Sequence, residues 1–210
     1  MPAPALRRTS PASERNQGPI LAELKRLLPP TGRMLEIAGG TGQHAVHFAA
    51  GLPGWQWQPT DPDPDALGSI AAWAAAAPAP NRLLPPLRLD VLAATWPVDA
   101  TGPWDAIFCA NLLHIAPWAC CAALMQGAAR RLSPDGRLIT YGPYLVDGEP
   151  TAAGNLAFDA DLRSRDPTWG IRWLHEVVAE ARQAGLALQQ RVAMPANNLL
   201  LVFGRAAPPA

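Results

Sequence analysis

The feature that most constrains the fold of this chain is the run MLEIAGGTGQHAVHFAAGL, which begins at residue 34. Its first five residues predict a strand, AGGTG predicts a tight glycine loop, and the apolar positions that follow predict a helix ending near Gly51. A strand, loop and helix in this order are typical of parallel sheets covered by helices. In such sheets a ligand binds beyond the carboxyl ends of the strands.

The same alternation continues along the chain. Further strands are predicted in residues 55–61, 83–91, 104–111 and 133–144, and helices in residues 13–28, 64–77, 116–132 and 175–185. Two last strands, at 186–193 and 198–205, are joined only by MPAN and must therefore be antiparallel neighbours. We expect Ser13 to cap the first helix and Asp63 and Asp65 to cap the helix at 64–77. Residues 1–12 are expected to be a disordered tail, and residues 13–205 a single domain.

Composition excludes several classes of protein. The chain has 210 residues, 49% of them hydrophobic, and 17 basic residues balance 17 acidic ones, so no electrostatic footprint for nucleic acid is expected. Three cysteines without paired spacing argue against a disulfide framework and for a reducing cytoplasm. No apolar run is long enough to cross a membrane, and the N-terminus has no secretory signal.

The glycine loop by itself fits two cofactors. GTGQHA satisfies the dinucleotide fingerprint GxGxxG/A, and Asp61 follows Gly42 at the spacing of an acid that binds the ribose. A nicotinamide dinucleotide is therefore one interpretation.

Three features favour S-adenosylmethionine (SAM) instead. Glu36 precedes Gly40 by four residues, where an acid is expected to orient a cationic cofactor that carries an amino acid. Asp90 ends the third predicted strand, where it can accept a hydrogen bond from an adenine amino group. Lys25 is the only lysine, so the Tyr-x-x-x-Lys pair of short-chain dehydrogenases and the lysine of a P-loop are both absent.

The segments SERNQGPIL, LEIAGGTGQHA, WQPTDPD, ANLLHI and PANNLLLVF occur in this order. With them the chain resembles class I SAM-dependent methyltransferases over residues 13–205, and more narrowly the uncharacterised DUF938 methyltransferase-like family. The resemblance implies an α/β fold with a Rossmann-like seven-stranded, mostly parallel sheet, helices on both faces and an antiparallel C-terminal hairpin. It implies no particular methyl acceptor.

For the cofactor, we expect the loop amides and Glu36 to seat SAM and Asp61 to bind the ribose hydroxyls. Asp90 is expected at the adenine, with Val91 packing on the ring. The resemblance also places Arg15 and Asn16 in an N-terminal segment that folds over the cofactor. The predicted cofactor residues are Arg15, Asn16, Glu36, Ala38, Gly39, Gly40, Thr41, Gly42, His44, Asp61, Pro62, Asp90, Val91, Asn111 and Leu112. His44 and His47 have half of a metal-ligand spacing, but no second pair completes it, so no metal is predicted.

The acceptor end is predicted around Asn111 and the following ANLLHI. His114 lies there, although a histidine between two apolar residues is otherwise often part of a core. The long aromatic and charged stretch that leaves the strand at 133–144 is expected to form an ordered lid. The candidate bases are His114, Tyr144 and Asp159, and the candidate substrate contacts are Phe158, Arg163, Arg172, Asn197 and Asn198.

The sequence thus predicts a SAM-dependent methyltransferase with a small-molecule acceptor and no nucleic-acid or membrane partner. Methyl transfer is an in-line displacement that chiefly requires orientation, and a general base is useful only for an acceptor that arrives protonated. Two alternatives stay open: a SAM-binding module without catalysis that acts through a protein partner, and an NAD-binding oxidoreductase.

Overall fold

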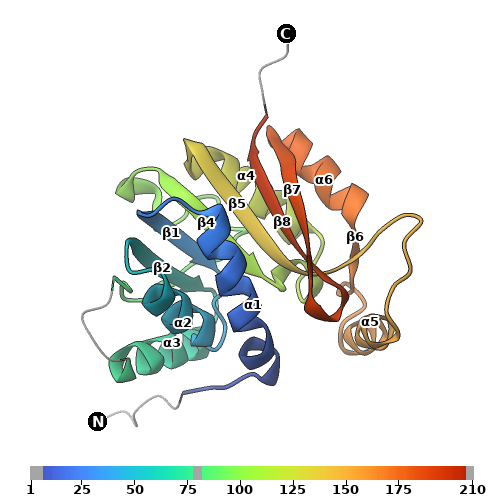
Figure 1. Cartoon of the computed structure of the whole chain (residues 1–210), viewed down its shortest axis with the longest axis horizontal. Coiled ribbons are helices and arrows are strands. Elements are labelled where there is room, and N and C mark those ends of the chain that lie inside the picture. The colour runs from blue at the N-terminus through green and yellow to red at the C-terminus, as the bar shows by residue number, and fades with distance from the viewer. Residues whose placement is uncertain (1–6, 78–81, 207–210) are drawn as a thin grey trace. The chain divides into compact units, whose positions relative to one another are not determined.

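The computed structural model describes residues 7–77 and 82–206 (Figure 1). The chain divides into two compact units, residues 1–108 and residues 109–210. Strands and helices alternate along the chain, and its parallel strands are followed by an antiparallel C-terminal pair. The predicted Rossmann-like α/β class is confirmed.

The first unit contains three helices and the parallel strands. Its elements are α1 (Pro11–Leu27), β1 (Gly32–Ile37), α2 (Gln43–Gly51), β2 (Trp55–Asp61), α3 (Pro64–Ala76), β3 (Leu87–Arg88), a short 3-10 helix (Asp99–Thr101) and β4 (Trp104–Ala110), whose last two residues belong to the second unit. The strand order is β3-β2-β1-β4. Glu36 pairs with Pro59 and Asp61 with Arg88, so the carboxyl ends of β1, β2 and β3 meet at one edge.

Helix α1 begins earlier than the sequence predicted. Ser10, rather than Ser13, is the N-cap, and its side chain accepts a hydrogen bond from the Ser13 N–H. Pro11 then occupies the first turn, where proline is favoured because the missing N–H has no helical partner there. Of the expected tail, residues 1–6 lie outside the described residues, and residues 11 and 12 are helical. Of the two predicted caps of α3, Asp63 is confirmed and Asp65 is wrong: Asp65 lies inside the first turn, where its N–H donates to Asp63 Oδ1 at 3.0 Å.

An aromatic cluster forms the core of the first unit. The ring of Phe48 on α2 lies 5.5 Å from Trp57 on β2 and 5.5 Å from Phe108 on β4. All three side chains are fully buried. Large buried aromatic rings contribute strongly to packing, so this cluster fixes α2 against the strands that carry the site.

The second unit contains the antiparallel strands. Its elements are η2 (Leu112–His114), α4 (Ala119–Arg131), β5 (Leu132–Leu145), α5 (Ala153–Arg165), β6 (Arg172–Trp173), α6 (Leu174–Gln183), β7 (Leu186–Met194), η3 (Pro195–Asn197) and β8 (Asn198–Arg205). β8 lies between β5 and β7 and is antiparallel to both, which confirms the predicted hairpin. The two-residue β6 adds an eighth strand, parallel to the end of β5.

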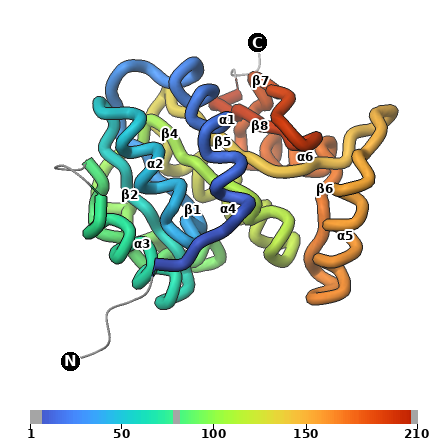
Figure 2. The backbone as a smooth tube through the Cα atoms, turned by 60° about the horizontal axis from the view of Figure 1, so that its bottom comes forward, coloured from blue at the N-terminus to red at the C-terminus, as the bar shows by residue number. Residues whose placement is uncertain are grey.

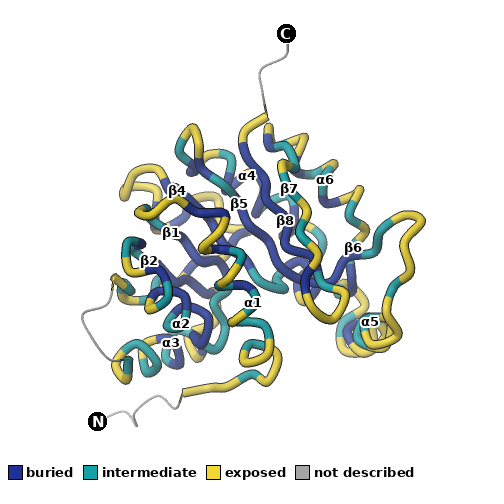
Figure 3. The backbone as a smooth tube through the Cα atoms, in the orientation of Figure 1, coloured by how far each residue is buried: buried dark blue, intermediate teal, exposed yellow. Residues whose placement is uncertain are grey.

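The stretch between β5 and β6 is ordered, as expected of a lid, and contains α5. Leu162 is the one fully buried residue of this helix, and Leu156 is more than half exposed. Figures 2 and 3 show α5 at the periphery of its unit, largely exposed along its length. With so little apolar surface buried, α5 depends on specific polar contacts for its position.

Gly42 at the start of α2 gives a test of the packing in the first unit. Its φ is +88°, and a Cβ there would lie 2.7 Å from the Ile70 Cα on α3. We expect Gly42→Ala to lower the free energy of unfolding by roughly 2–5 kcal/mol, from backbone strain and a clash with backbone atoms. In Gly154→Ala the added Cβ meets nothing within 4 Å, and this control is expected to be neutral or stabilising by up to about 1 kcal/mol. Urea unfolding measures both, and equal effects would contradict the packing argument.

Candidate functional site

The glycine loop, residues 38–42, is held by the end of β2. The Gly39 N–H donates to the Thr60 carbonyl at 2.8 Å, and the Gly40 N–H donates to Asp61 Oδ2 at 2.9 Å. Ala38 and Gly40 both have positive φ, +55° and +59°. A Cβ on Gly40 would meet no atom within 4 Å, so the loop faces open space at this residue. The backbone there is available to a ligand.

Glu36 lies buried beside this loop, with 2% of its surface exposed. Among the described residues its carboxylate accepts one hydrogen bond, from Trp57 Nε1 to Oε2 at 2.8 Å. Burial raises the pKa of Glu36 to about 7, against the lowering effect of the Trp57 hydrogen bond, and the nearby Asp61 raises it further. A buried carboxyl group with this pKa is stabilised in its charged form by a cation. The residue therefore fits a positively charged ligand group.

Asp61, at the end of β2, is fixed through both carboxylate oxygens. Oδ2 accepts the Gly40 N–H, and Oδ1 accepts the Asp63 N–H at 2.9 Å. Its pKa is raised because burial outweighs these backbone hydrogen bonds. Each oxygen keeps a second lone pair for a hydroxyl donor.

Asp90 is brought to the same edge by the backbone. The Leu89 N–H donates to the Asp61 carbonyl at 3.1 Å, which places the next residue beyond β3. Asp90 is exposed, and its Oδ1 accepts the Leu92 N–H at 2.9 Å. Val91 is buried, and the carbonyl of Pro62 accepts a hydrogen bond from Arg88. The structure thus brings together the predicted residues at the ends of β1, β2 and β3.

The predicted residues on α1 and α2 differ in their contacts. His44 Nε2 lies 2.7 Å from Asn16 Oδ1, and the imidazole stacks on Phe48 with ring centroids 5.0 Å apart. Burial lowers the pKa of His44 to about 4, so its ring is neutral and Nε2–H is the donor in this pair. The Arg15 side chain is exposed and makes no hydrogen bond or ion pair with any described residue. Thr41 bonds to Gln43 through its side chain.

In the second unit, His114 is the most unusual predicted residue. Its ring is fully buried, and neither Nδ1 nor Nε2 has a hydrogen-bond partner among the described residues. Burial, together with the charge of Arg172, lowers its pKa to about 3. Tyr144 contacts the ring edge-on at 5.2 Å. Buried polar atoms without partners are rare in native structures, so this neutral imidazole calls for a ligand or a chemical role.

The backbone around His114 is held from both sides. Its N–H donates to the carbonyl of Asn111, a residue with φ of +61°, and its own carbonyl accepts the Gly170 N–H at 2.9 Å. Asn111 in turn donates its N–H to the Tyr141 carbonyl at 2.8 Å, and Leu112 opens η2. The imidazole is therefore placed by its own loop rather than by its side-chain contacts.

The other two candidate bases are already bonded. The Tyr144 hydroxyl lies 2.8 Å from Thr140 Oγ1, and burial raises the pKa of the phenol. Asp159 accepts the Ile171 N–H at 2.6 Å on Oδ1 and Arg163 Nε at 2.9 Å on Oδ2. Burial acts to raise the pKa of Asp159, but these two hydrogen bonds outweigh it and the pKa is lowered.

The predicted substrate contacts mostly hold their own loops. Arg172 donates to the carbonyls of Leu113, Ala116 and Thr168. Asn197 Oδ1 accepts the Ala152 N–H at 3.0 Å, at the start of α5. Arg163 pairs with Asp159, and the Asn198 side chain donates to the carbonyl of Pro195 in η3. Phe158 is half-buried.

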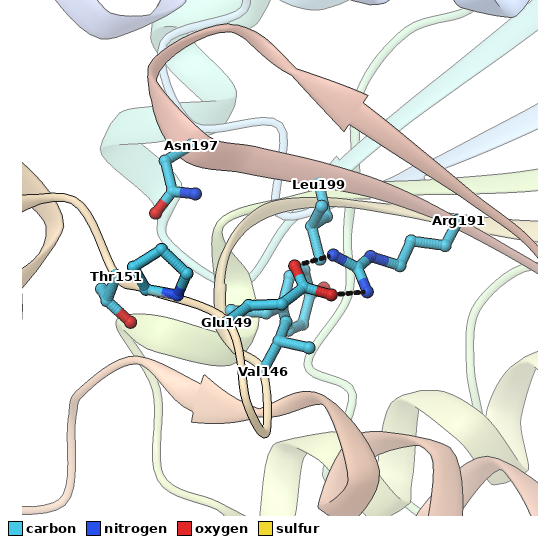
Figure 4. A pocket seen from close by; sticks show the side chains of 8 residues that line it. Val146, Glu149, Thr151, Arg191, Asn197 and Leu199 are labelled. Atoms are coloured by element: carbon cyan, nitrogen blue, oxygen red, sulfur yellow. Dashed lines mark hydrogen bonds and ion pairs between the residues drawn. The ribbon is translucent and has the colours of Figure 1, made fainter.

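A small pocket opens in the second unit (Figure 4). Tyr144 and Asn197 line it, and the Arg191 guanidinium binds the Glu149 carboxylate at its wall. The other lining residues are Val146, Pro150, Thr151 and Leu199. Two of the predicted acceptor-side residues therefore share a pocket.

Sequence reasoning missed the partners that orient the predicted groups. Trp57 donates a hydrogen bond to the Glu36 carboxylate, and Thr140 is hydrogen-bonded to the hydroxyl of Tyr144. The alternation in WQWQPTD places Trp55 and Trp57 on one face of β2, which was a usable signal. That the indole bonds to Glu36 depends on strand register, which the sequence alone does not give.

No group of three or more His, Cys, Asp or Glu side chains in residues 7–77 and 82–206 is arranged to hold a metal ion. Among the helices of these same residues, none combines the length and hydropathy needed to traverse a bilayer.

Several solved structures that share this fold are named as methyltransferases. The mitomycin 7-O-methyltransferase MmcR matches 93% of this chain with a TM-score of 0.77 at 18% identity. An O-methyltransferase family protein from Burkholderia thailandensis matches 94% with a TM-score of 0.76 at 18% identity. An O-methyltransferase family 2 protein from Planctomyces limnophilus, in complex with apigenin, matches 93% with a TM-score of 0.74 at 21% identity.

The chain spans just over half the length of these proteins, covering 54%, 58% and 60% of them respectively. At such identities the likeness establishes the shared fold. The family is given by sequence: residues 7–205 match DUF938, described as a protein of unknown function, and the chain belongs to this family.

The raised pKa of Glu36 makes a prediction about stability. Below pH 4.5 the carboxyl is protonated in both the folded and the unfolded chain, so its burial carries no charge penalty. As pH rises toward 7 the unfolded chain ionises first, and the folded state loses up to about 3 kcal/mol relative to it. We therefore expect Glu36→Gln to gain stability relative to the native protein between pH 4.5 and 8. Urea unfolding at both pH values measures this, and a difference that does not change with pH would contradict it.

Proposed function

We propose that this chain is a SAM-dependent methyltransferase that acts on a small-molecule acceptor. The observation that carries the proposal is the buried Glu36 carboxyl, singly hydrogen-bonded, beside a glycine loop that faces open space at Gly40. SAM has a cationic α-amino group that this acid fits. A nicotinamide dinucleotide has no ammonium group.

The other residues of this edge would hold the rest of the cofactor. In the proposal Asp61 accepts the ribose hydroxyls with its remaining lone pairs, and Asp90 accepts the adenine amino group while Val91 packs on the ring. Arg15, whose side chain has no partner among the described residues, would pair with the carboxylate of the cofactor. Asn111 and Leu112 belong to the second unit, and their contact with the cofactor stays a prediction.

SAM supplies a methyl group activated by its sulfonium, so the protein has to orient the acceptor and remove a proton where the acceptor carries one. Of the three candidate bases, His114 is the one whose nitrogens are available for that second task, and the bound acceptor would have to raise its pKa from about 3 for the ring to take up the proton. Its ring is neutral, and both nitrogens are without partners, whereas Tyr144 and Asp159 are committed to other groups. We propose a hydroxyl acceptor, in keeping with the names of the O-methyltransferases that share the fold.

Calorimetry tests the choice of cofactor. We expect S-adenosylhomocysteine, the demethylated product, to bind with a dissociation constant in the micromolar range, and Glu36→Gln and Asp61→Asn each to weaken it at least tenfold, because each removes a charged hydrogen-bond acceptor. NAD serves as the comparison ligand. Binding of NAD with no binding of SAM or its product at millimolar concentration would overturn the proposal.

Substitution of the candidate bases tests the acceptor chemistry. Methyl transfer from labelled SAM is measured with the small-molecule fraction of a cell extract, and the labelled product is followed. We expect His114→Phe, which keeps a ring in the buried space, to lower the rate by about 10²–10⁴-fold with little change in S-adenosylhomocysteine affinity. Tyr144→Phe and Asp159→Asn are expected to change it much less. Binding of the cofactor without turnover by the native protein would favour the non-catalytic module instead.

A further inference from the structure

The segment before and at the start of α1, residues 7–16, is here named the N-terminal strap. It runs beside α3 and α2 before the chain continues into α1 (Figures 1 and 2). Three buried polar side chains of the first unit take hydrogen-bond partners from it: Gln43, His44 and Ser69. All three lie in or next to elements that shape the glycine loop.

Ser69 on α3 links the strap to the loop through one hydroxyl. The Arg8 N–H donates to Ser69 Oγ at 2.8 Å, and Ser69 Oγ donates to the carbonyl of Thr41 at 2.7 Å. Ser69 is completely buried. Trp73 Nε1 also donates to the Arg8 carbonyl at 2.8 Å, which fixes this part of the strap on α3.

Gln43, the first residue of α2, makes the second link. Its Oε1 accepts the Ser10 N–H at 2.6 Å and the Thr41 hydroxyl at 3.1 Å, and its Nε2 lies 3.5 Å from Glu14 Oε1. The side chain is 6% exposed. One amide group therefore contacts the strap at two points and the glycine loop at a third.

The third link joins Asn16 to His44 at 2.7 Å. Buried polar groups lose free energy when their partners are removed, because neither water nor protein then satisfies them. If the strap detached, Gln43, His44 and Ser69 would each lose a hydrogen-bond partner. Gln43 and Ser69, which bond to Thr41, would then no longer be held in place. The conformations of strap and loop are thus coupled.

We propose that the N-terminal strap holds the glycine loop in its binding conformation, and that Gln43 and Ser69 are the positioning residues through which it sets the rate of cofactor release. This inference rests on the proposed function for the identity of the cofactor. The coupling between strap and loop does not depend on it. Release then requires the strap to loosen, so the rate of release follows the strength of these hydrogen bonds.

The experiment compares Gln43→Met and Ser69→Ala with a control variant on α1, the helix that the strap leads into. Glu23→Gln weakens the ion pair with Arg26 on α1, away from the strap, and leaves every strap contact in place. Hydrogen exchange of residues 7–16 and 38–44 is followed in the protein without ligand. Release of S-adenosylhomocysteine is followed by stopped flow.

We expect both variants to raise exchange in the two segments together, and to speed release at least tenfold, while Glu23→Gln behaves as the native protein does. The midpoint of urea unfolding separates this from a general loss of stability. If Gln43→Met does not fold, Ser69→Ala carries the same test. Faster exchange in the strap alone, or an unchanged release rate, would overturn the proposal. A native protein that binds no S-adenosylhomocysteine would refute the proposed function and the control of release, while the exchange data would still decide whether strap and loop are coupled.

Discussion

The burial of one carboxyl group, that of Glu36, is the constraint on which the site of the first unit depends. Parallel pairing of β1 with β2 brings the Trp57 indole to it, and the loop that follows is fixed by the Thr60 carbonyl and the Asp61 carboxylate. These contacts orient the acid without neutralising it. A buried acid without a cationic partner lowers the stability of the unliganded protein at neutral pH. A protein keeps such an acid where the binding of a ligand compensates for the lost stability.

The second unit shows a related arrangement around His114. Its backbone is anchored at Asn111 and Gly170, and Gly142 leaves room for the ring. Arg172, beyond α5, donates to the carbonyls of Leu113 and Ala116, on either side of His114 in sequence. In the described part of this unit, the two imidazole nitrogens are the only buried side-chain polar atoms without a hydrogen-bond partner. The surroundings therefore do not use the hydrogen-bonding capacity of this ring, which distinguishes it from an ordinary core histidine.

Much of the fold followed from the sequence, because glycine, proline and apolar periodicity are local signals. The loop, the helix at 64–76 and the C-terminal hairpin could all be predicted in this way. What could not be predicted were contacts between residues far apart in sequence. Ser69 bonds to Arg8 across 61 positions, and Asn197 reaches Ala152 across 45. Even the local cap was misplaced, because Ser10 and Ser13 are equally good caps by type and Pro11 decides between them.

Burial shifts the pKa values of Glu36 and His114 so that the neutral form of each side chain is favoured. Glu36 is therefore an acid whose charged form a cation would stabilise, and His114 is a neutral imidazole that binds a proton only weakly. In the first unit, a cofactor with an ammonium group would supply the cation, and SAM is such a compound. A nicotinamide dinucleotide supplies no ammonium group for Glu36. Within the first unit, the buried acid therefore favours a cofactor with an ammonium group more strongly than the glycine loop does, since that loop fits either cofactor.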